Sequence, residues 1–179
     1  MSHPREPDPV KLISSLFSHE KGNIEKVIGQ LSDIYGPVDH ISPELLFDRT
    51  RYYAKEMGWP LHRRFVSFEK LVPVGTLVEV KLKTNEVEQM YLRGENRTVN
   101  IDPGCISPER LILATGKNYV HRIYLSKGIY ADLTLIFKKG SFSPLKWTYP
   151  DYADPEVIGF FNGVRGQYMD QLREMKRID

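Results

Sequence analysis

The stretch from Tyr119 to Phe137 constrains the fold more than any other part of the chain. Its side chains alternate between apolar and polar on both sides of a short loop that ends in glycine. This period-two alternation predicts a β-hairpin with one apolar face. The opposite face carries Arg122, Tyr124, Tyr130, Asp132 and Thr134. These polar positions form either an ordinary solvated sheet surface or part of a functional site.

The register of the hairpin follows from its two faces. A three-residue loop at residues 126–128 keeps apolar residues opposite apolar ones, with the glycine in a left-handed conformation. It places Arg122 opposite Asp132 and Tyr124 opposite Tyr130. A two-residue loop would mix the faces. Each such cross-strand pair contributes about 0.2–1 kcal/mol as structure alone, so the pairing does not require a functional role.

Three segments have apolar residues at helical spacing and recognisable end signals. The predicted helices are residues 24–34, residues 76–92 and the segment that starts at Asp154-Pro155. Glycine followed by proline ends the first helix, and a T-x-x-E capping box begins the second. An N-cap aspartate with proline at the first helical position begins the third.

Short runs of apolar and β-branched residues predict strands between these helices. The predicted strands are Val10–Ser18, Val38–Phe47, His62–Glu69, Val99–Ile101, Leu111–Thr115 and the hairpin. Pro43 would confine the second strand to an edge or break it. Asp102-Pro103-Gly104 is expected to form a tight turn.

The order β-α-β-β-α-β, followed by the hairpin and a closing helix, predicts an α+β fold. We expect a single domain over residues 10–179 with a ferredoxin-like split βαβ core, extended by the hairpin and the last helix. Residues 1–9 are polar and rich in proline, which predicts a disordered lead-in. A different α+β sheet with the same order of elements is the alternative.

Composition limits the classes of function. The 179 residues suffice for one core, and 25 Lys and Arg against 23 Asp and Glu give a net charge of +2, too small to indicate nucleic acid by itself. A single cysteine, Cys105, excludes an intrachain disulfide and a cysteine-based zinc cluster, and fits a reducing compartment. Without a signal peptide or an apolar run of membrane-spanning length, the expected location is cytoplasmic and no membrane partner is predicted.

Motifs for common cofactors are incomplete. Thr115–Asn118 lacks the upstream glycine of a phosphate loop and the Ser or Thr that follows its lysine. Phe65–Phe68 matches the end of the RNA-recognition-motif signature, but Leu61–Arg64 fails its first half. The five histidines show no metal-ligand spacing. No metal site is predicted, and no particular cofactor is indicated.

One hypothesis is a binding protein for a small anionic ligand, such as a nucleotide or an RNA phosphate. Arginine recognises phosphate, and aromatic rings stack on bases. The candidate ligand-binding residues are Arg122, Tyr124, Tyr130, Asp132, Arg64, Asn85, Asn100, Trp147 and Tyr149. Several have an ordinary structural explanation: Asn85 lies with Lys81 and Glu88 on a helix face that could simply be solvated, and Trp147 could pack on the sheet rather than cover a pocket.

Two other hypotheses stay open. The chain could be an enzyme of hydrolase or transferase type, with Asp102 or Asp132 as general base and Arg122 stabilising charge. It could instead be an assembly protein, in which the aromatic C-terminal segment and the apolar seam of the last helix join two copies as a homodimer. A cavity in which Arg122, Asp132 and Asp102 converge would favour the first two hypotheses.

Several stretches together resemble an uncharacterised prokaryotic family, the domain of unknown function DUF4416. They are Tyr53–Gly58, Phe65–Phe68, Lys83–Glu86, Asn100–Gly104, His121–Tyr124, Gly128–Tyr130 and Trp147–Asp151. The resemblance extends from about Val10 to Leu172 and implies a single domain. It implies no reaction and no catalytic residues. Some members are labelled GTP-binding, but this chain has neither a phosphate loop nor an N-K-x-D motif.

Overall fold

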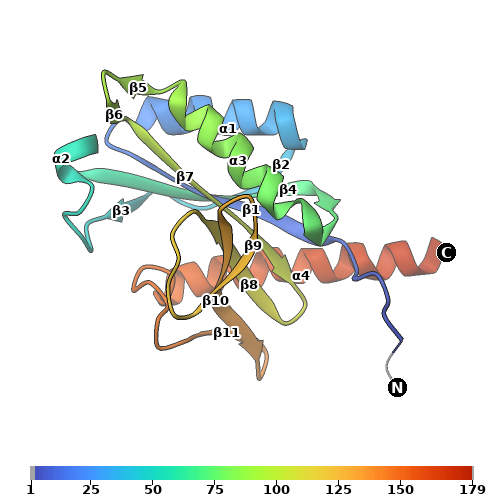
Figure 1. Ribbon diagram of the computed structural model, residues 1–179. Helices are drawn as coiled ribbons and strands as arrows, with labels where there is room; N and C mark the ends of the chain where they lie inside the picture. Colours follow the sequence, from blue (N-terminus) through green and yellow to red (C-terminus); the bar gives the residue numbers. More distant parts are fainter. Residues whose placement is uncertain (1–2, 179) are drawn as a thin grey trace.

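Helices cover both faces of a nine-stranded antiparallel sheet in the computed structural model, which describes residues 3–178 (Figure 1). The strands are β1 Val10–Ser18, β2 Val38–Ile41, β3 Leu45–Phe47, β4 Leu61–Val72, β5 Leu92–Arg93, β6 Asn96–Arg97, β7 Val99–Ser107, β8 Arg110–Thr115, β9 Arg122–Ser126, β10 Ile129–Lys138 and β11 Ser141–Pro144. The helices are α1 Lys21–Tyr35, α2 Ala54–Met57, α3 Leu77–Gln89 and α4 Pro155–Ile178, with a 3-10 turn η1 at Val74–Thr76.

The main sheet has the strand order β11-β10-β8-β7-β1-β4-β2, with β3 beside β4 and β9 beside β10. Strands β5 and β6 form a separate two-stranded ribbon. Helix α1 connects β1 to β2, which are separated by β4, and α3 connects β4 to β7, which are separated by β1. The chain is therefore an α+β protein with one large sheet and a single domain.

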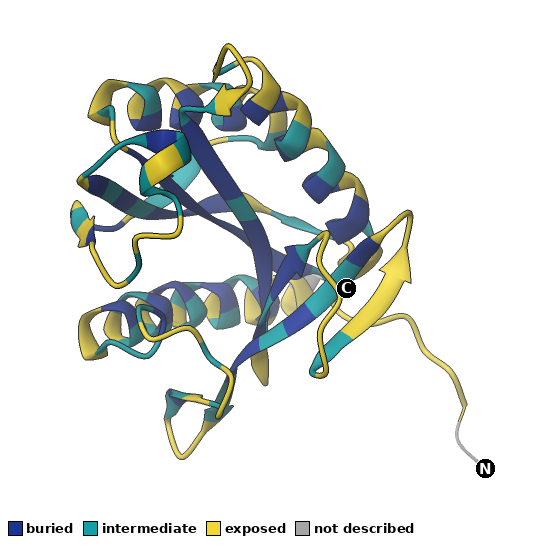
Figure 2. Cartoon of the chain, turned by 60° about the vertical axis from the view of Figure 1, so that its left-hand side comes forward, coloured by how far each residue is buried: buried dark blue, intermediate teal, exposed yellow. Residues whose placement is uncertain are grey.

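The two helix layers follow from alternation along the central strands. In β1, Leu12 and Leu16 pack with α1 and α3, whereas Ile13 packs on the opposite face with Phe161 and Tyr168 of α4. Successive strand residues point to opposite faces, so both faces of this strand are buried and each carries apolar side chains. Figure 2 shows the resulting buried strands between the two helix layers.

The apolar seam of α4 is used within the chain. Phe161, Val164, Tyr168 and Leu172 are buried against the sheet, while Met175 near the end of the helix is exposed. The seam that was expected to join two copies therefore has a partner inside the same molecule.

Most helix ends lie where the sequence predicts them. Gly36 follows α1 with a φ of 95°, and α4 starts at Pro155. The predicted capping box at Thr76 is wrong: its hydroxyl donates to the Pro73 carbonyl, and no side chain caps α3. The reason is that η1 leads directly into α3, so the Thr76 backbone is already helical.

Three strand predictions needed correction. The segment around Pro43 is two short strands, β2 and β3, as its proline suggested. The irregular stretch after Lys139 contains a further strand, β11. The predicted turn at Asp102-Pro103-Gly104 is wrong, because β7 runs through it from Val99 to Ser107 and β1 pairs with it throughout.

The hairpin register is confirmed near its base and differs at its tip. Tyr124 lies opposite Tyr130 and Arg122 opposite Asp132, as predicted. The loop, however, has two residues, because Lys127 and Gly128 both adopt positive φ angles and Ser126 pairs with Ile129. A register shift after Ile129 restores the matching of faces.

A buried ion pair ties the edge of the sheet to its centre. Lys11 of β1 is fully buried, pairs with Asp39 of β2 and donates to Gln171 Oε1 of α4 at 2.9 Å. Ser67 of β4 donates to the other Asp39 oxygen at 2.5 Å. Burial raises the pKa of Asp39, but the hydrogen bonds from Lys11 and Ser67 outweigh it, so the pKa is lowered overall.

We expect Asp39→Asn to lower the free energy of unfolding by about 3–5 kcal/mol, because it leaves the buried Lys11 ammonium without a counter-charge. Urea denaturation at neutral pH measures the loss. Glu79→Gln is the matched control, since it breaks the exposed pair between Glu79 and Lys127 and should change stability by at most about 1 kcal/mol. Equal effects of the two substitutions would contradict this role of the buried pair.

No helix among residues 3–178 is both long enough and apolar enough to cross a membrane.

Candidate functional site

The sheet opens between β7 and β8, and this opening creates the site. Strand β8 pairs with β7 only from Gly104 to Ser107, so within residues 3–178 the first half of β7 has β1 as its only strand partner. Pro103 has no N–H to donate to a neighbouring strand. At Gly104 the two strands approach each other closely, since a Cβ atom there would collide with the Ile112 carbonyl oxygen.

Two charged side chains of α3 replace the missing strand. Lys81 Nζ donates to the Ile101 carbonyl at 2.9 Å, and Glu88 Oε1 accepts from the Ile101 N–H at 2.6 Å. Both side chains are buried, which contradicts the solvated helix face considered from the sequence. Their charges are buried because a backbone group that faces no strand still needs a hydrogen-bond partner.

A cavity of about 710 Å³ fills the opening. Its walls come from α3, the start of β7, the hairpin with the end of β8, the loop before α2, and the segment Tyr149–Tyr152. Six cationic and four acidic side chains line it: Arg49, Arg63, Lys81, Arg97, Lys117 and Arg122, with Glu88, Asp102, Asp132 and Asp151. Within residues 3–178, no group of metal-ligating side chains gathers here.

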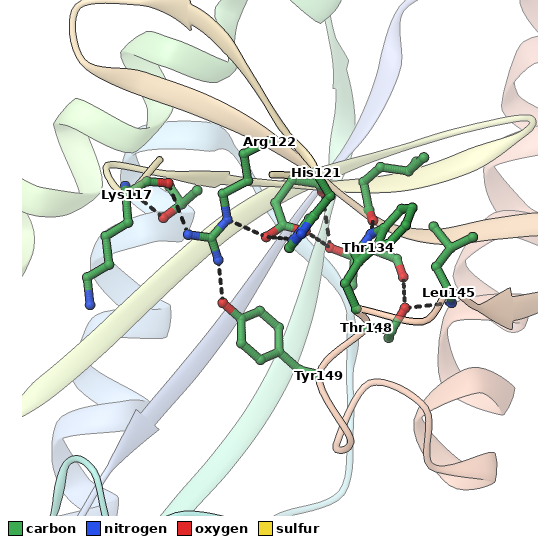
Figure 3. Close-up of polar contacts among 11 residues, drawn as sticks. Lys117, His121, Arg122, Thr134, Leu145, Thr148 and Tyr149 are labelled. Carbon is green, nitrogen blue, oxygen red and sulfur yellow. Dashed lines mark hydrogen bonds and ion pairs between the residues drawn. The ribbon is translucent and has the colours of Figure 1, made fainter. Parts of the chain in front are cut away.

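The hairpin wall is organised around Arg122 and Asp132. Arg122 Nε donates to Asp132 Oδ2 at 2.8 Å, and its other nitrogens donate to the Lys117 carbonyl at 3.0 Å and the Tyr149 hydroxyl at 2.7 Å. Figure 3 shows Arg122 held between Lys117 and Tyr149. His121 Nε2 lies 3.3 Å from the same Asp132 oxygen. Asp132 is therefore a buried carboxylate whose main role is to fix Arg122.

Lys117 is the exposed cation of this wall. No hydrogen bond or ion pair of its ammonium group is found within the described part of the chain, and Nζ lies 5.3 Å from the centre of the Tyr52 ring. The Lys117 backbone carbonyl accepts a hydrogen bond from Arg122, so both residues belong to the same wall of the cavity. Asp132 pairs with Arg122.

The facing wall carries a chain of hydrogen bonds from β6 to β7. Arg97 Nη1 donates to Asn100 Oδ1 at 2.9 Å, and Asn100 Nδ2 donates to Asp102 Oδ2 at 2.7 Å. Asp102 Oδ1 lies 3.8 Å from Lys81 Nζ, and about a third of the Asp102 side chain is exposed. Arg97 also pairs with Glu56 at 2.7 Å, and this hydrogen bond raises the pKa of Arg97. Asp102 is thus the accessible end of an ordered polar chain.

The inner end of the cavity is aromatic and contains a buried arginine. The Arg63 guanidinium lies 4.0 Å from the Phe47 ring centre and 5.1 Å from that of Phe17, and it pairs with Asp151. Burial lowers the pKa of Arg63, although an arginine stays charged under all ordinary conditions. Burial likewise raises the pKa of Tyr53 to about 12.

Six of the predicted site residues meet in this cavity. They are Arg122, Asp132, Asp102, Asn100, Asn85 and Tyr149. They come from four separate segments of the chain, so the predicted convergence of Arg122, Asp132 and Asp102 is observed in the structure.

The other four predicted residues lie elsewhere. Arg64 points to the opposite side of β4, where it donates to the Ser42 carbonyl and lies 3.3 Å from Glu25 of α1. Trp147 stacks on His121 and donates to the Leu133 carbonyl, so it packs on the sheet rather than covering the cavity. Tyr124 and Tyr130 form an edge-to-face pair that does not line the cavity.

Sequence reasoning missed Lys81, Arg97 and Lys117 as cavity residues, and within the adjacent pair Arg63 and Arg64 it selected Arg64. The alternation of side chains along β4 could have identified Arg63. Phe65 and Phe68 point to opposite faces of β4, and Arg63, two residues before Phe65, shares the face of Phe65. No local signal predicts Lys81, because its burial depends on where β8 leaves β7.

We expect Glu88→Gln to change how stability depends on pH. Burial raises the pKa of Glu88 above its usual 4.5, so the folded state binds this proton more tightly than the unfolded chain. The resulting stabilisation is present below about pH 4.5 and is lost as the pH rises through the raised pKa. Glutamine keeps an acceptor for the Ile101 N–H and does not ionise. The stability of Glu88→Gln relative to the native protein should therefore increase between pH 4 and pH 8 in urea denaturation, and parallel curves would contradict the burial argument.

Comparison with known proteins places the chain in a family. No match was found among curated proteins or among solved structures. A family model described as "Domain of unknown function (DUF4416)" matches residues 8–168, which is most of the chain. The resemblance seen in the sequence is thereby confirmed, and the chain belongs to the DUF4416 family.

Proposed function

We propose that the cavity binds a small anionic ligand, with Lys117 and Arg122 as the first contacts for its negative group. The observation that supports this most is that Lys117 and Arg122 line the same wall of the cavity, with the Lys117 side chain exposed and the Arg122 side chain fixed by Asp132. Phosphate and carboxylate groups form charge-assisted hydrogen bonds with such pairs.

The dimensions and lining of the cavity favour a small molecule over a nucleic-acid backbone. Its volume of about 710 Å³ lies within the range of roughly 300–1,000 Å³ typical of small-molecule sites. Tyr52, Tyr53 and Phe47 line it beside the cations, and aromatic faces accept planar groups such as a nucleobase. A nucleotide is therefore the preferred ligand class, and an RNA phosphate is the less favoured one.

We also propose that the segment from β1 to β7 is a ferredoxin-like split βαβ core. The support is the antiparallel strand order β7-β1-β4-β2, with α1 and α3 packed on the same face. A cytoplasmic location belongs to the same proposal and rests on the single, buried Cys105.

Lys117→Gln should weaken binding of the anionic ligand roughly ten- to hundredfold, because it removes one charge-assisted hydrogen bond of about 1.5–3 kcal/mol. The ligand is found first by thermal-shift screening of nucleotides and phosphorylated metabolites, and affinity is then measured by calorimetry. Lys127→Gln at the exposed hairpin tip is the matched control and should bind normally. If no compound shifts the melting temperature, or if Lys117→Gln binds like the native protein, the proposal fails.

An enzymatic role is the second candidate, and the accessibility of Asp102 favours it. Of the two carboxylates considered as general base, Asp132 is nearly buried and holds Arg122, whereas Asp102 faces the cavity beside Lys81. Glu88, whose pKa is raised by burial, lines the same cavity. Carboxyl groups with perturbed pKa values in a cleft are typical of catalytic sites.

We expect Asp102→Asn to reduce hydrolysis of a chromogenic phosphate ester by about 10²–10⁴-fold without changing affinity for an inert analogue. Asn preserves the shape of the side chain but removes the base. Asp33→Asn is the control, because Asp33 is exposed on α1 and does not line the cavity. Absence of turnover by the native protein, or unchanged turnover in Asp102→Asn, would leave ligand binding as the sole proposed function.

A further inference from the structure

Buried polar atoms without a hydrogen-bond partner gather beside the inner end of the cavity, which Arg63 and Tyr152 line and Ser15 does not. Within residues 3–178 such atoms include Arg63 Nε, the Tyr152 hydroxyl and the Ser15 hydroxyl. These three residues are at least 95% buried. A buried polar atom without a partner costs about 1–3 kcal/mol, so three of them in one region need an explanation.

Strand pairing brings the three atoms to the same place. Phe17 of β1 lies opposite Arg63 of β4, and Ser15, two residues earlier, lies opposite Phe65. Residues two apart on a strand point to the same face, so Ser15 and Arg63 share the face that the cavity occupies. Tyr152 packs edge-to-face on Phe65 with ring centres 5.2 Å apart.

Other observations support this proximity. The Arg63 guanidinium lies 5.9 Å from the centre of the Tyr152 ring. Burial raises the pKa of Tyr152, while the charge of Arg63 and the hydroxyl of Ser15 both oppose that rise. The Ser15 hydroxyl thus lies close enough to the Tyr152 hydroxyl to lower its pKa as a hydrogen-bonding group does, and among the described residues neither hydroxyl has a partner of standard hydrogen-bond geometry. All three groups can donate to an added acceptor.

We propose that Arg63 Nε, Tyr152 and Ser15 form a second anion subsite, so that the cavity takes a small molecule with two anionic groups. This rests on the proposed function: one anionic group would bind at Lys117 and Arg122, the other at the inner end. Carboxylate and phosphoryl oxygens accept hydrogen bonds without donating any, as three converging donors require. A phosphorylated acid or a bisphosphate has the necessary chemistry.

Asp151 sets the strength of this subsite. Its carboxylate pairs with Arg63 Nη1 and lines the cavity, so it occupies one part of the guanidinium and leaves Nε free. Asp102, which lies opposite Ser15 across the β1–β7 pair, adds a second negative charge, and Lys81 offsets it. The ligand oxyanion therefore competes with Asp151 for the charge of Arg63.

The test follows the Arg63 Nε–H signal by ¹H–¹⁵N NMR, with the signal assigned from its loss in Arg63→Lys. Inorganic phosphate and acetate are the two probes, and whichever moves the signal at lower concentration identifies the preferred oxyanion. Tyr152→Phe and Ser15→Ala should each weaken this response roughly tenfold. Both variants should keep or raise the melting temperature, because each removes an unpaired buried hydroxyl. Asp151→Asn should tighten binding.

Ser14→Ala is the matched control. Ser14 is also buried on β1 with an unpaired hydroxyl, but it points to the opposite face of the sheet, so its removal should not affect the response. A signal that neither anion moves means that the subsite holds water only and overturns the inference. A response that persists unchanged in Tyr152→Phe and Ser15→Ala also overturns it.

The two proposals fail in different ways. Binding that depends on Lys117 while the Arg63 signal stays still would support the proposed function and reject the inner subsite. A response of the Arg63 signal, together with ligand binding that Lys117→Gln leaves unchanged, would support the inner subsite and reject the outer one. If neither responds to any anion, both proposals are wrong.

Discussion

The opening of the sheet beside the first half of β7 is the constraint on which the site depends. Pro103 cannot donate to a neighbouring strand, and β8 pairs with β7 only beyond it. The backbone N–H and carbonyl of Ile101 then face α3. Glu88 accepts a hydrogen bond from the N–H, and Lys81 donates one to the carbonyl. The same bonds fix α3 against the edge of the strand and leave space for the cavity.

Most charges around the cavity serve the fold as well as the site. Arg122 is held by Asp132, Arg97 by Glu56, and Lys81 by a backbone carbonyl. Buried charges are tolerated in proteins when they are paired or hydrogen-bonded. The groups that stay free are therefore the informative ones, because the fold alone does not account for them. Within residues 3–178 they are the Lys117 ammonium at the rim and the unpaired donors around Arg63.

The sequence predicts those parts of this fold that depend on local patterns. The helix ends at Gly36 and Pro155 and the pairing of Arg122 with Asp132 follow from residue type and alternation. The strand through Asp102–Gly104 was missed, because Pro and Gly normally indicate a turn, and here β1 holds the segment extended. Arg64 was preferred to Arg63, although only Arg63 shares the face of the cavity. The two arginines are adjacent on β4, and adjacent strand residues point to opposite faces of the sheet.

The segment Tyr149–Tyr152 touches both ends of the cavity. Tyr149 accepts a hydrogen bond from Arg122, Asp151 pairs with Arg63, and Tyr152 stacks on Phe161 of α4. Four consecutive residues thus connect two separate arginines to one helix. If an anion bound at one end changes the position of this segment, it changes the affinity for an anion at the other end. The second anion then changes the affinity for the first by the same factor, because binding free energies are reciprocally linked. A short surface segment would then make the two ends of one cavity thermodynamically dependent on each other.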